Sequence, residues 1–484
     1  MPNPRDLAAE LALGALAAHG PLINSLADAY RDAGFTLALV GGPVRDAILG
    51  RLGNDLDFAS SARPADSVRI LKRWGDAIWE TGAAFGTIAA KKGDVMVEVT
   101  TFRSESYDPD SRKPAVDFGD SIEGDLSRRD FTVNAMALEL TGDSLLFIDL
   151  FDGAGDLAKK VLRTPVSARA SFSDDPLRMM RAARFVAQLD FSVDPEVIEA
   201  IEEMAGRLSI ISAERVRDEF TKTLMSPNPR AGLLLLVESG LASAFFPELP
   251  KLKLEIDEHH HHKDVYEHTL TVLDQAIAHE DRLGGPNLTI RLAALMHDIG
   301  KPRTRELIPG GGVSFHHHEV VGAKMTKKRL KELRFDSKTI DEVSNLVFLH
   351  LRFHGYGSGE WTDSAVRRYI RDAGELLDQL HVLTRADCTT RNKRKADQLS
   401  ATYDSLELRI AQLKAQEELD RIRPDLNGQE IMEILGIKPS RAVGEAYDYL
   451  LELRMERGPL GVEVATQELL AWASDKELGG AQEQ

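Results

Sequence analysis

The hydrophobic periodicity of the chain changes near Pro165. Between Leu37 and about Glu139, short apolar runs alternate with turn residues, which is typical of a mixed α/β domain. After Pro165 the spacing of apolar residues is helical almost throughout. A sheet-containing domain followed by helical domains is therefore the predicted architecture. The expected strands are TLALVGG, TIAAKK, VMVEVTTF and MALEL, and the expected helix among them is DSVRILKRWG.

The length of 484 residues exceeds what one hydrophobic core usually serves. We expect four segments: an α/β head with an N-terminal helix at 1–164, a helical neck and body at 165–253, a helical domain at 254–395 and a helical tail at 396–484. A Gly- and Asp-rich stretch from Tyr107 to Gly124 is expected to be a loop, because it carries almost no apolar periodicity.

The net charge of −17 argues against a surface that is generally basic. Two local basic runs are candidates for RNA contact, although a solvated helix face is the commoner meaning of such runs. The first run comprises Lys324, Lys327, Lys328, Arg329, Lys331, Arg334 and Lys338, and the second comprises Arg391, Lys393, Arg394 and Lys395.

The cellular compartment is predicted from what the sequence does not contain. Cys388 is the only cysteine, so no intrachain disulfide can form. No apolar stretch approaches the roughly 20 residues that span a bilayer, and the N-terminus lacks a signal-peptide pattern. We therefore expect a cytoplasmic protein that makes no membrane contact.

The stretch from Leu39 to Asp46 is predicted to be a strand end, a glycine turn and a helix start. Gly41 and Gly42 would let the backbone approach phosphate oxygens, and the helix N-terminus would offer unpaired N–H donors. Arg45 would add positive charge near a triphosphate. A plain turn before a helix is the alternative interpretation.

Two aspartates follow this turn at a short distance. In a strand, Asp55 and Asp57 point to the same face and present two carboxylates side by side. Their repulsion would be relieved by a cation, and Mg²⁺ suits oxygen ligands that it shares with substrate phosphates. Two exposed acids in a turn are the alternative.

The glycine turn and the two aspartates together resemble the DNA polymerase β-type nucleotidyltransferase superfamily. Such enzymes often place a third carboxylate on a later strand, and Glu98 is the positional candidate here. Glu98 could equally be an ordinary strand residue paired with Arg103.

The segment Gly124 to Met136, which reads GDLSRRDFTVNAM, is the most specific motif in the chain. It resembles the RRDFTINA motif of class II tRNA nucleotidyltransferases and their poly(A) polymerase relatives, with Val133 in place of the usual Ile. The resemblance implies that Asp130 and Asn134 lie around the ribose and that Arg129 reaches the nucleotide. A surface cluster of ion pairs is the alternative.

A second family-like motif begins at Asp174, which is expected to cap a helix with Pro176 in its first turn. The resemblance to class II enzymes implies that Asp175 and Arg178 act as a protein template for the incoming base. Uracil and guanine present the opposite hydrogen-bonding polarity and would leave buried groups unpaired, at a cost of ~1–3 kcal/mol each. Arg181 and Arg184 would complete the nucleotide pocket. The later segment from Ser212 to Phe220 resembles a family motif that braces the helices.

Further along, His268, His297, Asp298 and Asp387 follow the order of the HD metal-dependent phosphohydrolase superfamily. Imidazole and carboxylate ligands together suit Mn²⁺, Ni²⁺ or Zn²⁺. A second ion or a phosphate could be met by other histidines, namely His316, His317, His318 and His350. The run from His259 to His262 is interpreted as a solvated loop. A phosphatase or cyclic-phosphodiesterase activity is one reading of this domain, and a degenerate domain that helps to hold RNA is the other.

Together these resemblances imply a polymerase β-type α/β head, an all-α neck and body, and an all-α HD domain. The predicted reaction is addition of CCA to the tRNA 3′ end from CTP and ATP, with Mg²⁺ in the head. The alternatives are a bacterial poly(A) polymerase, an enzyme limited to CC or to terminal A, and an HD phosphohydrolase with a vestigial transferase.

Overall fold

The computed structural model describes residues 3–106, 115–119, 121–141, 145–253, 264–307, 309, 313–355, 361–389, 393–417 and 423–476. The chain divides into two compact units, Met1–Pro250 with Glu332–Arg334, and Lys251–Lys331 with Phe335–Gln484. Much of the predicted loop from Tyr107 to Gly124, the run from His259 to His262, and Arg391 lie outside the described residues.

The first unit opens with two helices, α1 (Pro4–Leu16) and α2 (Gly20–Asp32), separated by a short 3₁₀ turn. No single described helix is long and apolar enough to cross a membrane. By length and composition, α1 and α2 pass that test only as a pair, and they are bent by 99°.

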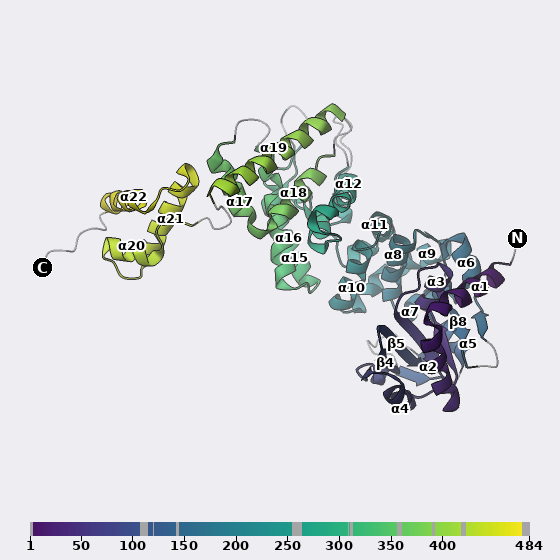
Figure 1. Ribbon diagram of the computed structural model, residues 1–484. Coiled ribbons are helices and arrows are strands. Elements are labelled where there is room, and N and C mark those ends of the chain that lie inside the picture. Colours follow the sequence, from purple (N-terminus) through teal and green to yellow (C-terminus); the bar gives the residue numbers. More distant parts are fainter. Residues whose placement is uncertain are drawn as a thin grey trace. The chain divides into compact units, whose positions relative to one another are not determined.

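A seven-stranded mixed sheet forms the head, in the order β3-β4-β5-β2-β1-β8-β9 (Figure 1). Its strands are β1 (Leu37–Val40), β2 (Asp55–Ser60), β3 (Ala77–Trp79), β4 (Thr87–Lys92), β5 (Val95–Thr101), β8 (Met136–Glu139) and β9 (Leu146–Asp149). The pair of β2 and β5 is parallel, whereas the other neighbouring pairs are antiparallel. A separate antiparallel pair consists of β6 (Arg103–Ser106) and β7 (Ala115–Phe118).

The central strand β1 is buried along its whole length, which explains its continuous apolar sequence LALV. The edge strands β3 and β9 are short and were not expected, because each carries too few residues to show a period of two. The helix α4 (Pro64–Trp74) packs against β4 and buries Ile70, Leu71 and Trp74. The predicted α/β head is confirmed.

The helices that follow are α5 (Ile122–Ser127), α6 (Gly153–Lys159), α7 (Ala168–Asp174), α8 (Leu177–Leu189), α9 (Pro195–Met204), α10 (Ala213–Leu224) and α11 (Pro229–Glu238). Both α10 and α11 pack against α8. A Cβ on Gly232 of α11 would lie 2.7 Å from the Ala183 carbonyl of α8, so only glycine permits this close approach. The predicted helical body is confirmed, with one short parallel strand pair, β10 (Val161–Leu162) and β11 (Ser192–Val193), as its exception.

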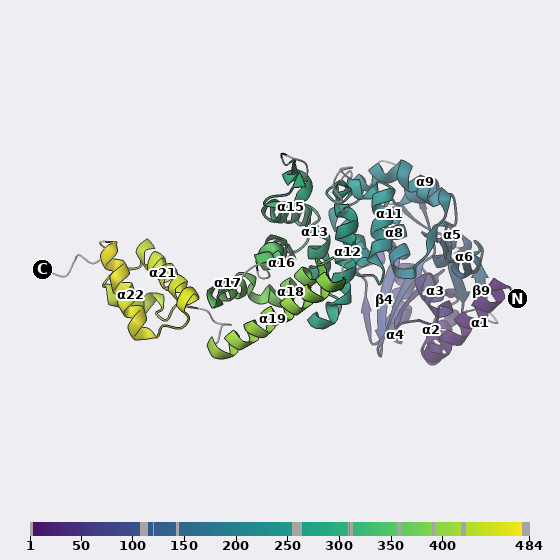
Figure 2. The same ribbon diagram turned by 90° about the horizontal axis from the view of Figure 1, so that it is seen from above.

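Among its described residues, the second unit is helical apart from one short antiparallel strand pair, β12 (Glu306–Leu307) and β13 (Val313–Ser314). Its helices are α12 (Val265–Ala278), α13 (Leu288–Met296), α14 (Lys301–Thr304), α15 (His318–Glu332), α16 (Ser337–Leu349), α17 (Asp363–Ala373), α18 (Leu377–Ala386), α19 (Lys393–Glu417), α20 (Gly428–Leu435), α21 (Arg441–Arg457) and α22 (Val462–Asp475). The last three pack around a core that includes Ile431, Leu450 and Leu469. Figure 2 shows α21 and α22 side by side.

His381 of α18 makes the second unit sensitive to acid. Burial lowers the pKa of His381 to about 4, although Glu407 opposes the change, and the imidazole stacks on Tyr369 with ring centroids 5.9 Å apart. As the pH falls, His381 of the unfolded chain therefore becomes protonated near its ordinary pKa of 6.5, whereas His381 of the folded chain stays neutral until about pH 4. Stability from the neutral imidazole is complete above about pH 6.5 and is lost as the pH falls toward about 4.

We therefore expect the free energy of unfolding, measured with urea, to fall between pH 7 and pH 4.5. In His381→Phe this fall should be smaller than in the wild type. The gap between the two pKa values corresponds to at most about 3 kcal/mol of unfolding free energy. Because other histidines titrate in both proteins, the measured quantity is the difference between the variant and the wild type at each pH. A difference that does not change with pH would show that His381 makes no such contribution.

Candidate active sites

The glycine turn between β1 and α3 (Gly42–Ile48) requires glycine at its first position. Gly41 has a φ of 76°, and a Cβ there would lie 2.5 Å from Nη1 of Arg129. Arg45 is buried and donates from Nη1 to Oδ1 of Asn134 at 2.6 Å, while its other nitrogens contact Asp46. Its guanidinium thus joins α3 to the turn of the RRDFT motif, and contact with a triphosphate remains a prediction for this residue.

The predicted carboxylates share one face of the sheet. Along β2, exposed Asp55 and Asp57 alternate with buried side chains, and the parallel register places Asp57 opposite Glu98 of β5. Although Asp57 is exposed to the cavity, the surrounding protein partly desolvates its carboxylate. This desolvation and then Glu98 raise the pKa of Asp57 to about 6, Asp55 adds to this effect, and Arg129 opposes it. Three carboxylates that repel one another are a donor set that a divalent cation would stabilise.

Arg129 is held by a residue to which sequence reasoning assigned no role. Asp125 is fully buried, and its two oxygens bind Arg128 at 2.6 Å and Arg129 at 3.0 Å. Asp125 binds Nε and Nη2 of Arg129, so the remaining nitrogen of the guanidinium, Nη1, lies beside Gly41. The two adjacent arginines of the motif, Arg128 and Arg129, thus both form ion pairs with the buried carboxylate of Asp125.

Asp130 joins the head to the helical body. Its Oδ1 accepts from Nδ2 of Asn134 at 2.9 Å, and its Oδ2 accepts from Nε of Arg181 at 2.7 Å. Burial would raise the pKa of Asp130, but Arg181 and these hydrogen bonds outweigh it and lower the pKa. Asp130 is therefore ionised at neutral pH in its buried position.

Glu219 of α10 extends the ion pair of Asp130 and Arg181 to Arg184. Glu219 is buried and binds Nε of Arg184 at 2.7 Å, and Arg181 lies 4.0 Å away on its other side. Glu219 belongs to the segment that was expected to brace the helices, but sequence reasoning did not single it out. A charged residue on the inner face of an amphipathic helix was the available signal.

The two predicted base-reading residues each have partners in the protein. Asp175 accepts from the Leu177 N–H at 3.0 Å through Oδ1 and from Nη2 of Arg215 at 2.9 Å through Oδ2. Arg178 donates from Nη1 to Ser171 and from Nη2 to the Arg128 carbonyl. These bonds use three of the five N–H groups of its guanidinium.

The prediction that Asp174 caps the following helix is wrong. Asp174 is the last residue of α7, and the N-cap position of α8 is Pro176. Asp175, which is extended between the two helices, accepts from the first N–H of α8 instead. A substitution of Asp175 therefore affects a helix cap as well as any contact with a base.

One cavity of about 960 Å³ brings these groups together. Its lining extends from the glycine turn and the sheet face to the start of α8. The described residues that line it include Gly42, Arg45, Asp57, Glu98, Arg129, Asp130, Asn134, Asp175, Arg178, Arg181 and Arg184, but not Gly41 or Asp55. The carboxylates of Asp57 and Glu98 thus face the same cavity as the predicted base-reading pair, Asp175 and Arg178.

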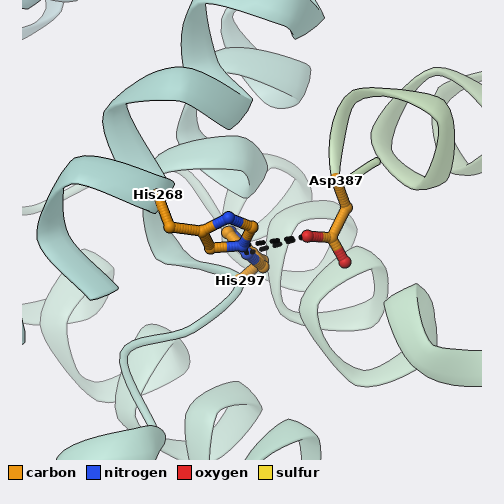
Figure 3. Close-up of side chains that lie close together, drawn as sticks. All are labelled: His268, His297 and Asp387. Carbon is orange, nitrogen blue, oxygen red and sulfur yellow. Dashed lines mark hydrogen bonds and ion pairs between the residues drawn. The ribbon is translucent and has the colours of Figure 1, made fainter. Parts of the chain in front are cut away.

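In the second unit, three predicted ligands converge from different helices. His268 lies on α12, His297 directly follows α13, and Asp387 directly follows α18. Figure 3 shows the two imidazoles beside each other and joined to the carboxylate. Nε2 of His268 lies 3.0 Å from Oδ1 of Asp387 and 3.3 Å from Nε2 of His297.

A second group lies next to the first. His318 and His350 approach with their Nε2 atoms 3.3 Å apart, and Oδ1 of Asp298 lies 3.2 Å from His318. The other oxygen of Asp298 lies 3.2 Å from Nε2 of His297, so this carboxylate lies between the two groups. His316 and His317 are exposed and belong to neither group.

Backbone carbonyls orient three of these rings. Nδ1 of His297, His318 and His350 lies 2.8, 2.8 and 2.6 Å from the carbonyl oxygen three residues earlier. A proton on Nδ1 satisfies each contact and leaves Nε2 as the lone-pair donor. Burial and then His297 lower the pKa of His350 to about 3, which favours the neutral imidazole that a metal ion requires.

The first basic run, which extends from Lys324 on α15 to Lys338 on α16, is partly neutralised by acids of α16. Lys327 lies 2.9 Å from Asp341, and Lys338 lies 3.8 Å from Glu342 of its own helix. Lys324 and Lys331 are exposed on α15. Contact of this face with RNA stays a prediction.

Residues 37–163 match the family profile "Poly A polymerase head domain", residues 190–252 match "Probable RNA and SrmB- binding site of polymerase A", and residues 265–392 match the HD domain. The A-adding tRNA nucleotidyltransferase of Deinococcus radiodurans is 32% identical over 423 residues, which cover 86% of this chain and 91% of that protein.

Other relatives match over less than half of this chain. The CCA-adding enzyme of Streptococcus pneumoniae serotype 19F is 44% identical over 220 residues, which cover 45% of this chain and 53% of that enzyme. Among solved structures, the Bacillus stearothermophilus CCA-adding enzyme in complex with CTP superposes with a TM-score of 0.67 at 24% identity, over 94% of this chain and 97% of that one. The last comparison supports the fold.

Proposed function

The chain belongs to the tRNA nucleotidyltransferase and poly(A) polymerase family, and from that membership we propose that it adds CCA to the 3′ end of tRNA from CTP and ATP. The observation that carries the proposal is the single cavity lined by Asp57 and Glu98 on the sheet and by Asp175 and Arg178 on the body. One end suits phosphoryl chemistry, and the other suits recognition of a base. A cytoplasmic location is part of the same proposal.

Nucleotidyl transfer forms a bond between the acceptor 3′ oxygen and the α-phosphorus and releases pyrophosphate. The family uses a divalent metal ion, and we assign Mg²⁺ to Asp55 and Asp57, where it would activate the hydroxyl and stabilise charge on the phosphates. Arg129, fixed by Asp125, directs Nη1 toward the glycine turn where a triphosphate would lie. The protein thus contributes mainly position and charge.

Base selection is assigned to Asp175 and Arg178. Cytosine and adenine both present an exocyclic amine beside a ring nitrogen acceptor, which suits one carboxylate and one guanidinium. Two N–H groups of Arg178 remain beyond its bonds to Ser171 and Arg128. Uracil and guanine present the reverse polarity and would leave both groups unpaired.

We expect Asp175→Asn to raise incorporation of UTP and GTP relative to CTP and ATP. Asn keeps an oxygen that can cap α8, but it replaces the second acceptor by an NH₂ donor. The relative rates with the four nucleotides should shift by about tenfold or more, in line with ~1–3 kcal/mol per mispaired group. Asp175→Ala serves as the comparison, because it removes the cap as well.

An unchanged nucleotide preference in Asp175→Asn, together with an equal loss of all four rates in Asp175→Ala, would reduce Asp175 to a helix cap. Thermal melting separates the two cases, since loss of a cap lowers the stability by about 1 kcal/mol whichever nucleotide is offered.

The proposal is tested with a tRNA that lacks its 3′ CCA and with labelled CTP and ATP, offered separately and together. We expect two cytidines with CTP alone, and two cytidines and one adenosine with both. A long adenosine tail would assign the chain to polyadenylation instead, and no addition would refute the transferase.

Addition of the terminal adenosine alone is the second candidate, because a relative that matches over 86% of this chain is an A-adding tRNA nucleotidyltransferase. Three acceptors distinguish the candidates, namely tRNA ending at the discriminator base, after one C, and after CC. A CCA-adding enzyme completes all three, whereas an A-adding enzyme extends only the last.

For the second unit we propose a metal-dependent phosphohydrolase site. The ligand atoms of His268, His297 and Asp387 lie within 4.8 Å of one another, and those of Asp298, His318 and His350 do likewise. Imidazole-rich groups suit Mn²⁺, Ni²⁺ or Zn²⁺, which would activate a water molecule toward a phosphate ester. If purified protein loaded with each of these ions releases no phosphate and opens no 2′,3′-cyclic phosphate, the alternative of a domain that only holds RNA is favoured.

A further inference from the structure

A row of three different side-chain chemistries extends along the sheet face from the candidate metal site. Thr100 lies two residues beyond Glu98 on β5, and therefore on the same face, about 6–7 Å along the strand. Thr87 of β4 lies opposite Thr100, and their hydroxyl oxygens are 2.9 Å apart. Phe85 precedes Thr87 by two residues, at the end of the short 3₁₀ turn Ala83–Phe85.

All of these residues line the cavity that holds Asp57, and Phe85 is 56% exposed. An aromatic ring that faces an open cavity offers a flat surface on which a nucleic-acid base can stack. The bond between the two threonines uses one of their two hydroxyl protons, which leaves one proton and several lone pairs for a ligand. In order from Asp57, the face thus presents carboxylates, hydroxyls and an aromatic ring.

This order matches the parts of a nucleoside. Its 3′-hydroxyl would meet the carboxylates, its 2′-hydroxyl would meet the threonine pair, and its base would meet the ring. The incoming nucleotide is assigned to the arginines and to Asp175 and Arg178 on the opposite lining of the cavity, so the sheet side is left for the second substrate. That substrate must place a 3′-hydroxyl at Asp57.

We propose that Phe85, Thr87 and Thr100 form the subsite for the 3′-terminal nucleoside of the RNA acceptor, in which Phe85 stacks on the base and the threonine pair binds the 2′-hydroxyl. The inference rests on the proposed transferase function and adds to it a means of accepting RNA and refusing DNA ends. The 2′-hydroxyl is the group that distinguishes the two.

The hydroxyl contact is tested with two acceptors that differ only in the 2′-hydroxyl of the last nucleotide. Wild-type protein should extend the ribose end about fivefold or more faster at limiting acceptor. In Thr87→Val and in Thr100→Val this preference should fall to nearly one, and in Thr100→Ser it should return. A preference that is unchanged in both valine variants would overturn the assignment of the threonines.

The stacking contact is tested through the KM of each substrate. Phe85→Ala should raise the KM for the acceptor by about 5- to 100-fold and leave the KM for ATP and CTP unchanged, while Phe85→Trp should retain a low KM. Trp79→Ala is the control, because Trp79 is an exposed aromatic residue of β3, with 41% of its surface accessible, and lies outside the cavity lining. An unchanged acceptor KM in Phe85→Ala would overturn the subsite.

These outcomes are separate from failure of the proposed function. Wild-type protein that adds no nucleotide to any acceptor refutes the transferase itself. Wild-type protein that adds nucleotides, with variants that keep the 2′-hydroxyl preference and the acceptor KM, refutes only the subsite. Melting temperatures of the variants should equal that of the wild type, because these side chains are partly or largely exposed.

Discussion

Replacing Asp57 by Asn is expected to lower the rate of nucleotide addition by about 10²-fold or more at saturating Mg²⁺. Asp57 faces the cavity, and it pairs in register with Glu98. Loss of one charged ligand removes several kcal/mol of transition-state stabilisation, and each 1.4 kcal/mol is about tenfold in rate. Asp55→Asn should have an effect of similar size, because the two carboxylates point to the same strand face.

The same variant should melt no lower than the wild type. Desolvation and Glu98 raise the pKa of Asp57 to about 6, so the protein destabilises the charge of this carboxylate relative to one in water, and a neutral amide in its place is tolerated. Asp66→Asn, on the surface helix α4, is the matched control and should keep full activity. Single-turnover rates near wild type in folded Asp57→Asn protein would remove this residue from the reaction.

The second large effect is expected in the other unit. Replacing His297 and Asp298 together by Ala should abolish any release of phosphate that Ni²⁺ or Mn²⁺ stimulates, and it should spare nucleotide addition. His297 belongs to one group of candidate ligands, and Asp298 lies between the two groups, so the double variant breaks both. The head carboxylates belong to the first unit, and neither set of ligands uses a residue of the other.

Both residues are buried, so the double variant carries a risk of unfolding. His268→Gln is the milder comparison, because its side chain is 15% exposed and only the first group loses a ligand. Circular dichroism and melting curves accompany the assays of both proteins. If folded His268→Gln protein loses nucleotide addition, the two chemistries are not separable.

Local patterns were sufficient to predict the fold class and the chemistry-bearing motifs. The alternation of Asp55 and Asp57 with buried Leu56 and Phe58 is a strand property that sequence shows directly. Gly41 was predicted from its place in the turn, and its positive φ and its closeness to Arg129 are physical reasons for glycine there. The expected strands β1, β4, β5 and β8 are present for the same reason.

Partners that are distant in sequence could not be predicted. Arg45 and Asn134 are separated by 89 positions, Arg184 and Glu219 by 35, and Asp175 and Arg215 by 40. Each side chain was interpreted as a nucleotide contact or left without a role, because no periodicity shows which charges of separate elements meet. The structure therefore adds Asp125, Arg215 and Glu219 to the surroundings of the site.

The metal ligands of the second unit show the same limit. The order of His268, His297, Asp298 and Asp387 was visible in the sequence, but the division into two groups was not. Four further histidines were candidates, and only the folded structure shows that His318 and His350 join Asp298.

The proposed addition of CCA is tested most directly by sequencing the 3′ ends that the purified protein makes on a tRNA ending at the discriminator base. All four nucleoside triphosphates are present at equal concentration, and the proposal is compared with the products. It predicts product that ends in CCA and is not extended further, and no product from Asp57→Asn protein assayed beside it. Ends that contain uridine or guanosine at random, a long adenosine tail, or an unextended acceptor with wild-type protein would contradict it.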